Sequence, residues 1–300
     1  MAGALGRRTV LAMVLAGYDD SDAARDALAL GRLLARTRRT TLKAACVYVF
    51  QPIHRPGDDE MEQALRTLAD ERLAGAAAQP GSPTPERLAL RGRSAPEGLQ
   101  RAAAKLGAET VVVGASHRGP ATRAMTSVPE RLLQGAPCEV AIAPRGYAAA
   151  APEALRDVGV AFDGGPESRA ALAVGAGLAR DAGARLHAIT VLNPHVSALT
   201  PRPMAAIEIS EYLAGGRQRL IETLGQAVAE LDRVDAVAEP LDGDEVDALA
   251  ARAAELDLLV VGSRSYGPLR RLLLGSVSTP LVRRAPGPLL LVPRGAGREA

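Results

Sequence analysis

The sequence predicts an α/β fold made of two tandem doubly wound domains, each a five-stranded parallel sheet with helices on both faces. Short apolar runs alternate with Ala-, Leu- and Glu-rich segments of helical periodicity, a pattern typical of parallel sheets covered on both sides. The pattern also repeats: residues 14–19 resemble residues 158–163, and residues 111–116 resemble residues 259–264, at a nearly constant offset. Right-handed crossovers between parallel strands then favour the doubly wound form.

The composition predicts a cytoplasmic protein with two domains of ordinary size. The 300 residues can form two hydrophobic cores, since 47% of them are hydrophobic and 23% are charged. The net charge of +2 indicates neither a nucleic-acid nor a membrane partner. Trp is absent and only two Phe are present, which excludes aromatic stacking platforms for single-stranded nucleic acid. Two cysteines, Cys46 and Cys138, are too few for a disulfide framework.

The first copy begins with a predicted strand over residues 10–18. Arg7 and Arg8 precede this strand and give it some likeness to an export signal. A matching run without arginines recurs in mid-chain, where an export signal cannot stand, so the run is interpreted as a buried strand. The remaining strands of this copy are expected near residues 41–49, 86–91, 109–114 and 138–143.

Small residues between the copies predict a linker over residues 147–155, which separates a first domain, residues 1–146, from a second, residues 156–300. Pro166 marks the first turn of the first helix of the second copy. The strands of the second copy are expected near residues 157–162, 185–192, 234–239, 258–262 and 288–292. The helices between them are expected near residues 166–182, 205–230, 243–256 and 276–284.

The segment after the fourth predicted strand of the second copy carries a specific motif. Gly262 and Gly275 enclose a gap of twelve positions, and Ser276 follows directly. The segment resembles the nucleotide loop of the universal stress protein family, Gly-x2-Gly-x9-Gly-Ser/Thr, which precedes the last helix of the domain. Ser265 replaces the middle glycine, and Gly267 stands two residues later. The resemblance covers nearly the whole chain and includes the acidic residue that ends the first strand.

The chemistry of these residues also favours a phosphate site. Gly275 leaves room for close approach to the backbone, and the N–H groups of Ser276 and Val277 would begin a helix whose unpaired donors attract an anion. Asp163 ends a neighbouring strand, where its carboxylate can accept hydrogen bonds from an adenine amino group or from ribose hydroxyls. Doubly wound sheets bind ligands at such strand ends, where the strand order reverses.

The resemblance implies an adenine nucleotide alpha hydrolase-like fold and a site for ATP, accompanied by Mg²⁺. It implies that Asp163 contacts the base or the sugar, and that Val191 or Leu192 of the second strand packs on the adenine. It also implies a sensor or regulator with at most slow hydrolysis. The nucleotide-binding residues expected in the second copy are Asp163, Gly164, Val191, Gly262, Ser263, Arg264, Gly267, Gly275, Ser276 and Val277.

The first copy departs from this motif. Asp19 and Gly114 are kept, but His117 stands at the middle glycine and Thr126 at the last one. The Cβ of a threonine crowds the approach of a phosphate to the backbone. We therefore expect one ATP site per chain, in the second copy, and a structural role for the first. The residues that could still hold a smaller ligand in the first copy are Asp19, Gly114, Gly119 and Ser127.

Three functions are compatible with these observations. The first is an ATP-binding stress-response module, the second a slow, metal-dependent ATP hydrolase that uses the same pocket, and the third a scaffold that binds no nucleotide. A P-loop enzyme is excluded because the Walker A pattern is missing and the only lysines are Lys43 and Lys105. The four histidines show no metal-ligand spacing, and no catalytic constellation is visible.

The last strands of the two copies are expected to pair with each other. Residues 139–143 and residues 289–292 are short apolar runs, and an exposed apolar edge invites pairing with another strand. The resemblance implies that such strands join two domains. The economical arrangement is an intramolecular pseudo-dimer, and a homodimer of the full chain is the alternative.

Overall fold

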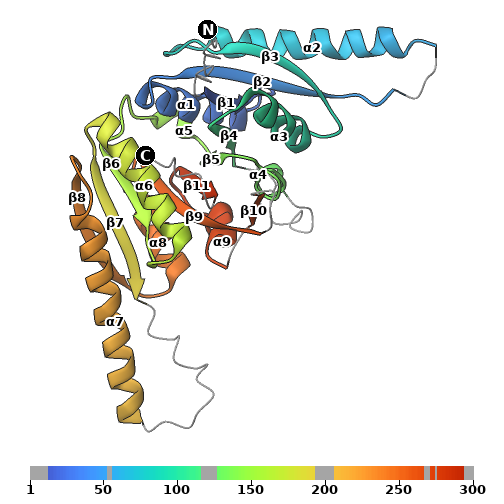
Figure 1. Cartoon of the computed structure of the whole chain (residues 1–300). Coiled ribbons are helices and arrows are strands. Elements are labelled where there is room, and N and C mark those ends of the chain that lie inside the picture. The colour runs from blue at the N-terminus through green and yellow to red at the C-terminus, as the bar shows by residue number, and fades with distance from the viewer. Residues whose placement is uncertain are drawn as a thin grey trace, which may run out of the picture.

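The computed structural model describes residues 13–52, 56–115, 127–192, 206–266, 271–273 and 276–293, with the backbone alone for residues 206–214, 264–266 and 271–273. Two halves of the chain repeat one order of elements (Figure 1). The first half contains β1 (Met13–Gly17), α1 (Asp22–Thr37), β2 (Thr41–Val49), α2 (Asp58–Ala78), β3 (Glu86–Gly92), α3 (Ala95–Leu106), β4 (Thr110–Gly114), α4 (Val128–Leu133) and β5 (Glu139–Ala143). After α5 (Tyr147–Ala150), the second half contains β6 (Asp157–Ala161), α6 (Pro166–Ala182), β7 (Arg185–Leu192), α7 (Ala206–Ala229), β8 (Asp235–Asp242), α8 (Glu245–Ala253), β9 (Leu258–Tyr266), β10 (Arg271–Leu273), α9 (Ser278–Arg284) and β11 (Leu289–Pro293).

Five strands of each half form a parallel sheet of the predicted doubly wound kind. Their order is β3-β2-β1-β4-β5 in the first half and β8-β7-β6-β9-β11 in the second, so the strand order reverses beside β1 and beside β6. Apolar side chains of α1, α2, α6 and α7 pack on one face of the sheet. Those of α3, α4, α8 and α9 pack on the other face. The predicted fold class is confirmed.

Local sequence signals set the ends of several helices. Ser21 caps α1 and Ser94 caps α3, each accepting a hydrogen bond from a backbone N–H of the first turn. Pro166 opens α6, and Gly183 ends it in the left-handed region, with φ at +67°. In the described part of the chain, no helix combines the length and the apolarity needed to cross a bilayer.

One strand differs from its expected length. The sequence places the end of the fourth strand of the second half at Gly262, whereas β9 continues to Tyr266 and pairs antiparallel with β10. An extended segment that leaves a sheet needs partners for its backbone N–H and C=O groups, and β10 supplies them. The sequence does not predict this hairpin, because residues 263–266 are polar or aromatic and do not alternate with apolar residues.

β5 and β11 join the two halves into one continuous sheet (Figure 1). They run antiparallel, with Ile142 opposite Leu289 and Val140 opposite Leu291, and these four side chains are buried. The expected pairing of the last strands is confirmed.

The segment between the halves is fastened to α1. The carboxylate of Asp26 on α1 accepts hydrogen bonds from the backbone N–H groups of Gly146 (2.9 Å) and Ala148 (2.8 Å). Tyr147 and Leu155 of the same segment are buried. The connection between the halves therefore packs against the first half over part of its length.

A fragment of residues 152–300 should self-associate. Without the first half, β11 exposes an apolar edge whose N–H and C=O groups have lost the partners that β5 provides. A second copy of the fragment offers an identical edge, which can pair antiparallel about a twofold axis. Sedimentation at micromolar concentration measures this, and a strictly monomeric fragment would contradict it.

Candidate functional site

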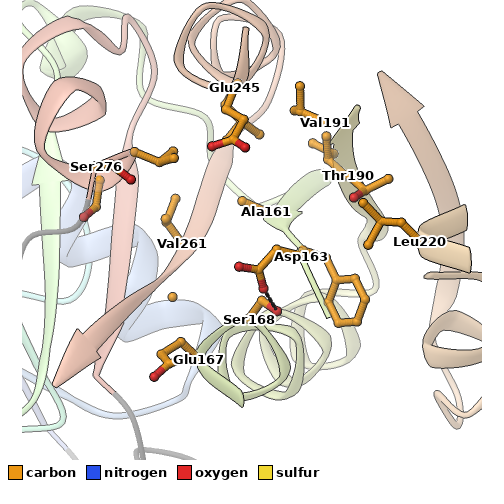
Figure 2. A pocket seen from close by; sticks show the side chains of 16 residues that line it. Ala161, Asp163, Glu167, Ser168, Thr190, Val191, Leu220, Glu245, Val261 and Ser276 are labelled. Carbon is orange, nitrogen blue, oxygen red and sulfur yellow. Dashed lines mark hydrogen bonds between the residues drawn. The ribbon is translucent and has the colours of Figure 1, made fainter. Parts of the chain in front are cut away.

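A cavity lies at the carboxyl ends of β6, β7 and β9 in the second half, beside the point where the strand order reverses (Figure 2). Helices α6, α7, α8 and α9 complete its walls. Doubly wound sheets place their ligand sites at this position. The lining residues are Ala161, Phe162, Asp163, Glu167, Ser168, Ile189, Thr190, Val191, Leu220, Glu245, Leu249, Val261, Gly262, Ser276, Val277 and Ser278.

Asp163 follows β6 and is held by the turn that leads into α6. Its Oδ1 accepts hydrogen bonds from the backbone N–H of Gly165 (2.8 Å) and from the hydroxyl of Ser168 (2.7 Å), the second of which is drawn in Figure 2. Gly164 makes the turn with φ at +81°, a conformation that favours glycine. The other carboxylate oxygen, Oδ2, has no hydrogen bond to the described residues. Asp163 is thus oriented at the cavity with acceptor capacity left for a ligand.

The structure brings half of the predicted site residues together. Asp163, Val191, Gly262, Ser276 and Val277 line the cavity, although they come from four separate elements or loops. Gly164 belongs to the turn below the cavity, and Ser263 and Leu192 are buried away from its lining. Arg264 lies on β9, opposite Leu273 of β10, and its side chain is not described. Gly267 and Gly275 lie outside the described residues.

Gly262 is a glycine because two backbones meet there. A Cβ built on Gly262 would lie 2.5 Å from the carbonyl oxygen of Glu167, in the first turn of α6. The same contact recurs in the first half, where a Cβ on Gly114 would lie 2.1 Å from the carbonyl oxygen of Ala23. Packing of a helix start against a strand end therefore requires both glycines, whether or not a ligand binds nearby.

Several lining residues were missed by the sequence reasoning. Glu167 and Glu245 each stand in the first turn of a helix, where an acid is common for electrostatic reasons and carries no functional signal of its own. Thr190 directly precedes the predicted Val191, but only the folded strand reveals it as a wall of the cavity. Leu220 comes from the middle of α7, and its position depends wholly on tertiary packing. In the described ranges, no group of three or more His, Cys, Asp or Glu side chains could hold a metal ion.

The helix after the candidate phosphate loop begins later than expected. α9 starts at Ser278, whereas the sequence predicts a start at Ser276. Val277 occupies the N-cap position, and no side chain accepts a capping hydrogen bond there. Ser276 and Val277 border the cavity just before this start. The end of α9 that carries the partial positive charge therefore faces the cavity region.

The family model of the universal stress protein family matches residues 13–144 and again residues 154–293. The chain belongs to the universal stress protein family. It carries two tandem domains of this kind, in agreement with the repeat seen in the sequence and with the two half-sheets.

Relatives and solved structures agree with this assignment. Universal stress protein Rv2005c of Mycobacterium tuberculosis is 30% identical over 192 residues, and the match spans 61% of each protein. A universal stress protein of Thermus aquaticus is 32% identical over 137 residues, which cover 44% of this chain and 95% of that protein. The crystal structure of a universal stress protein from Archaeoglobus fulgidus superposes with a TM-score of 0.59 over 94% of this chain and 96% of that one, at 18% identity, and so shows the same fold.

In the first universal stress protein domain, a carboxylate stands at the start of the last helix. Ser127, at the position that corresponds to Ser276, caps α4: its hydroxyl accepts from the N–H of Glu130 (3.4 Å). Glu130 returns the contact, since its Oε2 accepts from the N–H of Ser127 (2.9 Å). Its Oε1 is paired with Arg283 on α9 of the second domain. A built-in anion therefore occupies the end of α4 that would otherwise attract a phosphate.

The charge of Glu130 is maintained despite burial. Burial of this carboxyl favours the neutral form, but the hydrogen bond from the Ser127 backbone and the nearby Arg283 guanidinium outweigh burial and lower its pKa. Glu130 thus stays ionised near neutral pH.

A hydrogen-bonded network of side chains lies beside β1 in the first domain. Asp20 stands where Gly164 stands in the second domain, with φ at +67°, and its carboxylate accepts from the Tyr18 hydroxyl (3.1 Å). Gln79 donates to the same hydroxyl (2.8 Å). Burial and the hydrogen bond to Asp20 raise the pKa of Tyr18 to about 12, so the hydroxyl remains a neutral member of this network.

Helix α3 packs closely on its sheet. A Cβ on Gly98 of α3 would lie 2.7 Å from Val47 on β2, so the helix backbone rests directly on this side chain. The corresponding position of α8, four residues after the N-cap, is Ala248. The two helices thus differ by one methyl group at this position.

Proposed function

We propose that the chain is a nucleotide-binding regulatory protein of the stress response that binds adenine nucleotide, ATP with Mg²⁺, in the second domain. The observation that carries the proposal is the convergence of Asp163, Val191, Gly262, Ser276 and Val277 on one cavity. These are residues that the resemblance to the family motif singles out in the sequence. An apolar wall for a base, an oriented carboxylate for its donors and a helix start for phosphate make a consistent set.

The remaining residues of the motif complete the proposed site. Gly164, Ser263, Arg264, Gly267 and Gly275 would shape the turn after β6 and the phosphate loop. Because the described residues form no metal-binding group, a Mg²⁺ ion would enter with the phosphates of ATP rather than occupy a preformed site. There it would neutralise phosphate charge close to Glu167 and Glu245, which line the cavity.

Three features support a preference for the second domain. Glu130 occupies the helix start in the first domain, Tyr18 and Asp20 are joined by a hydrogen bond beside β1, and α3 rests directly on Val47. We therefore keep Asp19, Gly114, Gly119 and Ser127 as a vestigial site, in a first domain of residues 1–146. The second domain, residues 156–300, follows the linker of residues 147–155.

Calorimetric titration of the full chain with Mg²⁺–ATP should count one nucleotide per chain. The same samples should be assayed for released phosphate. Binding of ATP without phosphate release supports a regulatory module. Metal-dependent phosphate release would indicate a hydrolase. Neither binding nor phosphate release would indicate a scaffold. Thermal unfolding gives an independent measure, since a bound ligand stabilises only the state that binds it. Two equivalent sites per chain would contradict the proposed asymmetry.

A further inference from the structure

Thr190 on β7 carries a buried hydroxyl without a hydrogen-bond partner. In the part of the chain that the structure describes, two side-chain oxygens are buried in this way, those of Tyr147 and Thr190, and Thr190 is the one that lines the cavity. The residue is 1% exposed. A buried polar group without a partner is unfavourable. The ligand-free protein therefore retains an unsatisfied group in the wall of its candidate site.

The fold itself does not require a hydroxyl at this position. In the first domain the corresponding residue is Cys46, which has the same register on β2 relative to β1 as Thr190 has on β7 relative to β6. Cys46 is also 1% exposed, and a thiol is a weak hydrogen-bonding group. The hydroxyl thus occurs in the domain that holds the cavity, whereas the first domain has at this place a sulfhydryl that is hydrogen-bonded to Arg72.

Thr190 lies far from the candidate phosphate end of the cavity. The central strand β6 separates β7, which carries Thr190, from β9, which leads toward Ser276. In Figure 2, Thr190 and Leu220 lie on one side of the cavity and Ser276 on the other. Phe162, Val191 and Leu220 make the Thr190 end predominantly apolar. An apolar slot with one hydroxyl suits a flat heterocyclic base, which offers apolar faces and a polar edge.

We propose that the Thr190 hydroxyl is a binding residue that hydrogen-bonds to the polar edge of the nucleotide base and contributes to its selection; this inference rests on the proposed function. A threonine hydroxyl both donates and accepts, so it can pair with a ring nitrogen or with an exocyclic amino group. The hydroxyl oxygen has less than 1 Å² of accessible surface, so the side chains around it must shift for a base to reach it. Binding then supplies the partner that the free protein lacks. A ligand with an apolar edge leaves the hydroxyl unpaired and is disfavoured.

The test compares the wild-type chain with Thr190→Val and Thr190→Ser by calorimetric titration with adenosine, AMP and ATP. Thr190→Val keeps the shape of the side chain and removes the hydroxyl. It should weaken binding of all three ligands by the same factor, about tenfold, because the base is common to them. Thr190→Ser keeps the hydroxyl and loses one methyl group, so its affinities should stay within about fourfold of wild type.

Two further measurements distinguish a ligand contact from a structural role. Ligand-free Thr190→Val should unfold at the wild-type temperature or above, because an unpaired hydroxyl has been removed. Cys46→Val, the matched change in the first domain, should bind all three ligands as wild type does. Wild-type affinity in Thr190→Val, or an equal loss in both Thr190 variants, would overturn the inference and leave the proposed function standing. Failure of the wild-type chain to bind any of the three ligands would overturn both.

Discussion

Asp163→Ala should weaken nucleotide binding by about ten- to a hundredfold, which corresponds to the 1.5–3 kcal/mol of a hydrogen bond to a charged group. The carboxylate lines the cavity, where it can accept hydrogen bonds from the donors of a base or sugar. The substitution also removes the acceptor of the Gly165 N–H and the Ser168 hydroxyl, so the turn before α6 should loosen. Calorimetric titration measures the affinity, and urea unfolding measures the cost to stability.

Two variants separate these effects. Asp163→Asn keeps an oxygen for the Gly165 N–H and the Ser168 hydroxyl but loses the charge, so it should lose affinity while its stability stays near that of wild type. Asp19→Ala makes the equivalent change in the first domain, where Asp19 accepts from the N–H of Ser21 (3.2 Å), and it should leave affinity unchanged. If Asp19→Ala abolishes binding and Asp163→Ala does not, the site lies in the first domain.

Gly262→Ala should destabilise the second domain by about 1–3 kcal/mol, as expected for an added methyl group in a well-packed place. The new Cβ would meet backbone atoms of Glu167 and Ser168, which cannot rotate away, so α6 must move relative to β9. The start of α6 forms one wall of the cavity. If binding requires the wild-type spacing, the same strain should reduce affinity about five- to a hundredfold.

Two other glycines provide controls for this substitution. Gly177 lies within α6, and a Cβ there would have no heavy atom within 4 Å, so Gly177→Ala should stabilise the helix by about 0.5–1 kcal/mol. Gly114→Ala creates the matching clash with Ala23 in the first domain and should lower stability without lowering affinity. Wild-type stability in Gly262→Ala, measured by urea unfolding, would show that the strand and helix can separate without cost.

The fold could be predicted from the sequence because local patterns and the repeat agree. Apolar runs, the Pro166 and Gly183 signals and the two related halves all indicate the same doubly wound sheet. The hairpin of β9 and β10 could not be predicted, since its polar residues carry no alternation.

The site could be predicted only where residues close together in the sequence define it. Asp163 follows directly from a strand end, and Gly262 and Ser276 follow from the spacing of the glycine motif. Thr190 and Leu220 enter the cavity through tertiary packing, which a linear pattern does not contain. The contact of Glu130 with the start of α4 could have been predicted, because Ser127 and Glu130 have the spacing of a capping box. The sequence reasoning considered Ser127 as a ligand and overlooked its acidic neighbour.

Joining two copies in one chain allows the copies to become unequal. In a dimer of identical subunits, any substitution in the last helix would appear on both sides of the interface at once. Here Glu130 of α4 pairs with Arg283 of α9, whereas the positions related to them by the repeat hold Thr279 and Gln134, which form no ion pair of this kind. The Glu130 carboxylate can therefore cap the start of a helix in one domain and also form an ion pair with the other domain. Because both domains belong to one chain, each always faces the other, non-identical domain, so a substitution changes one side of the interface alone.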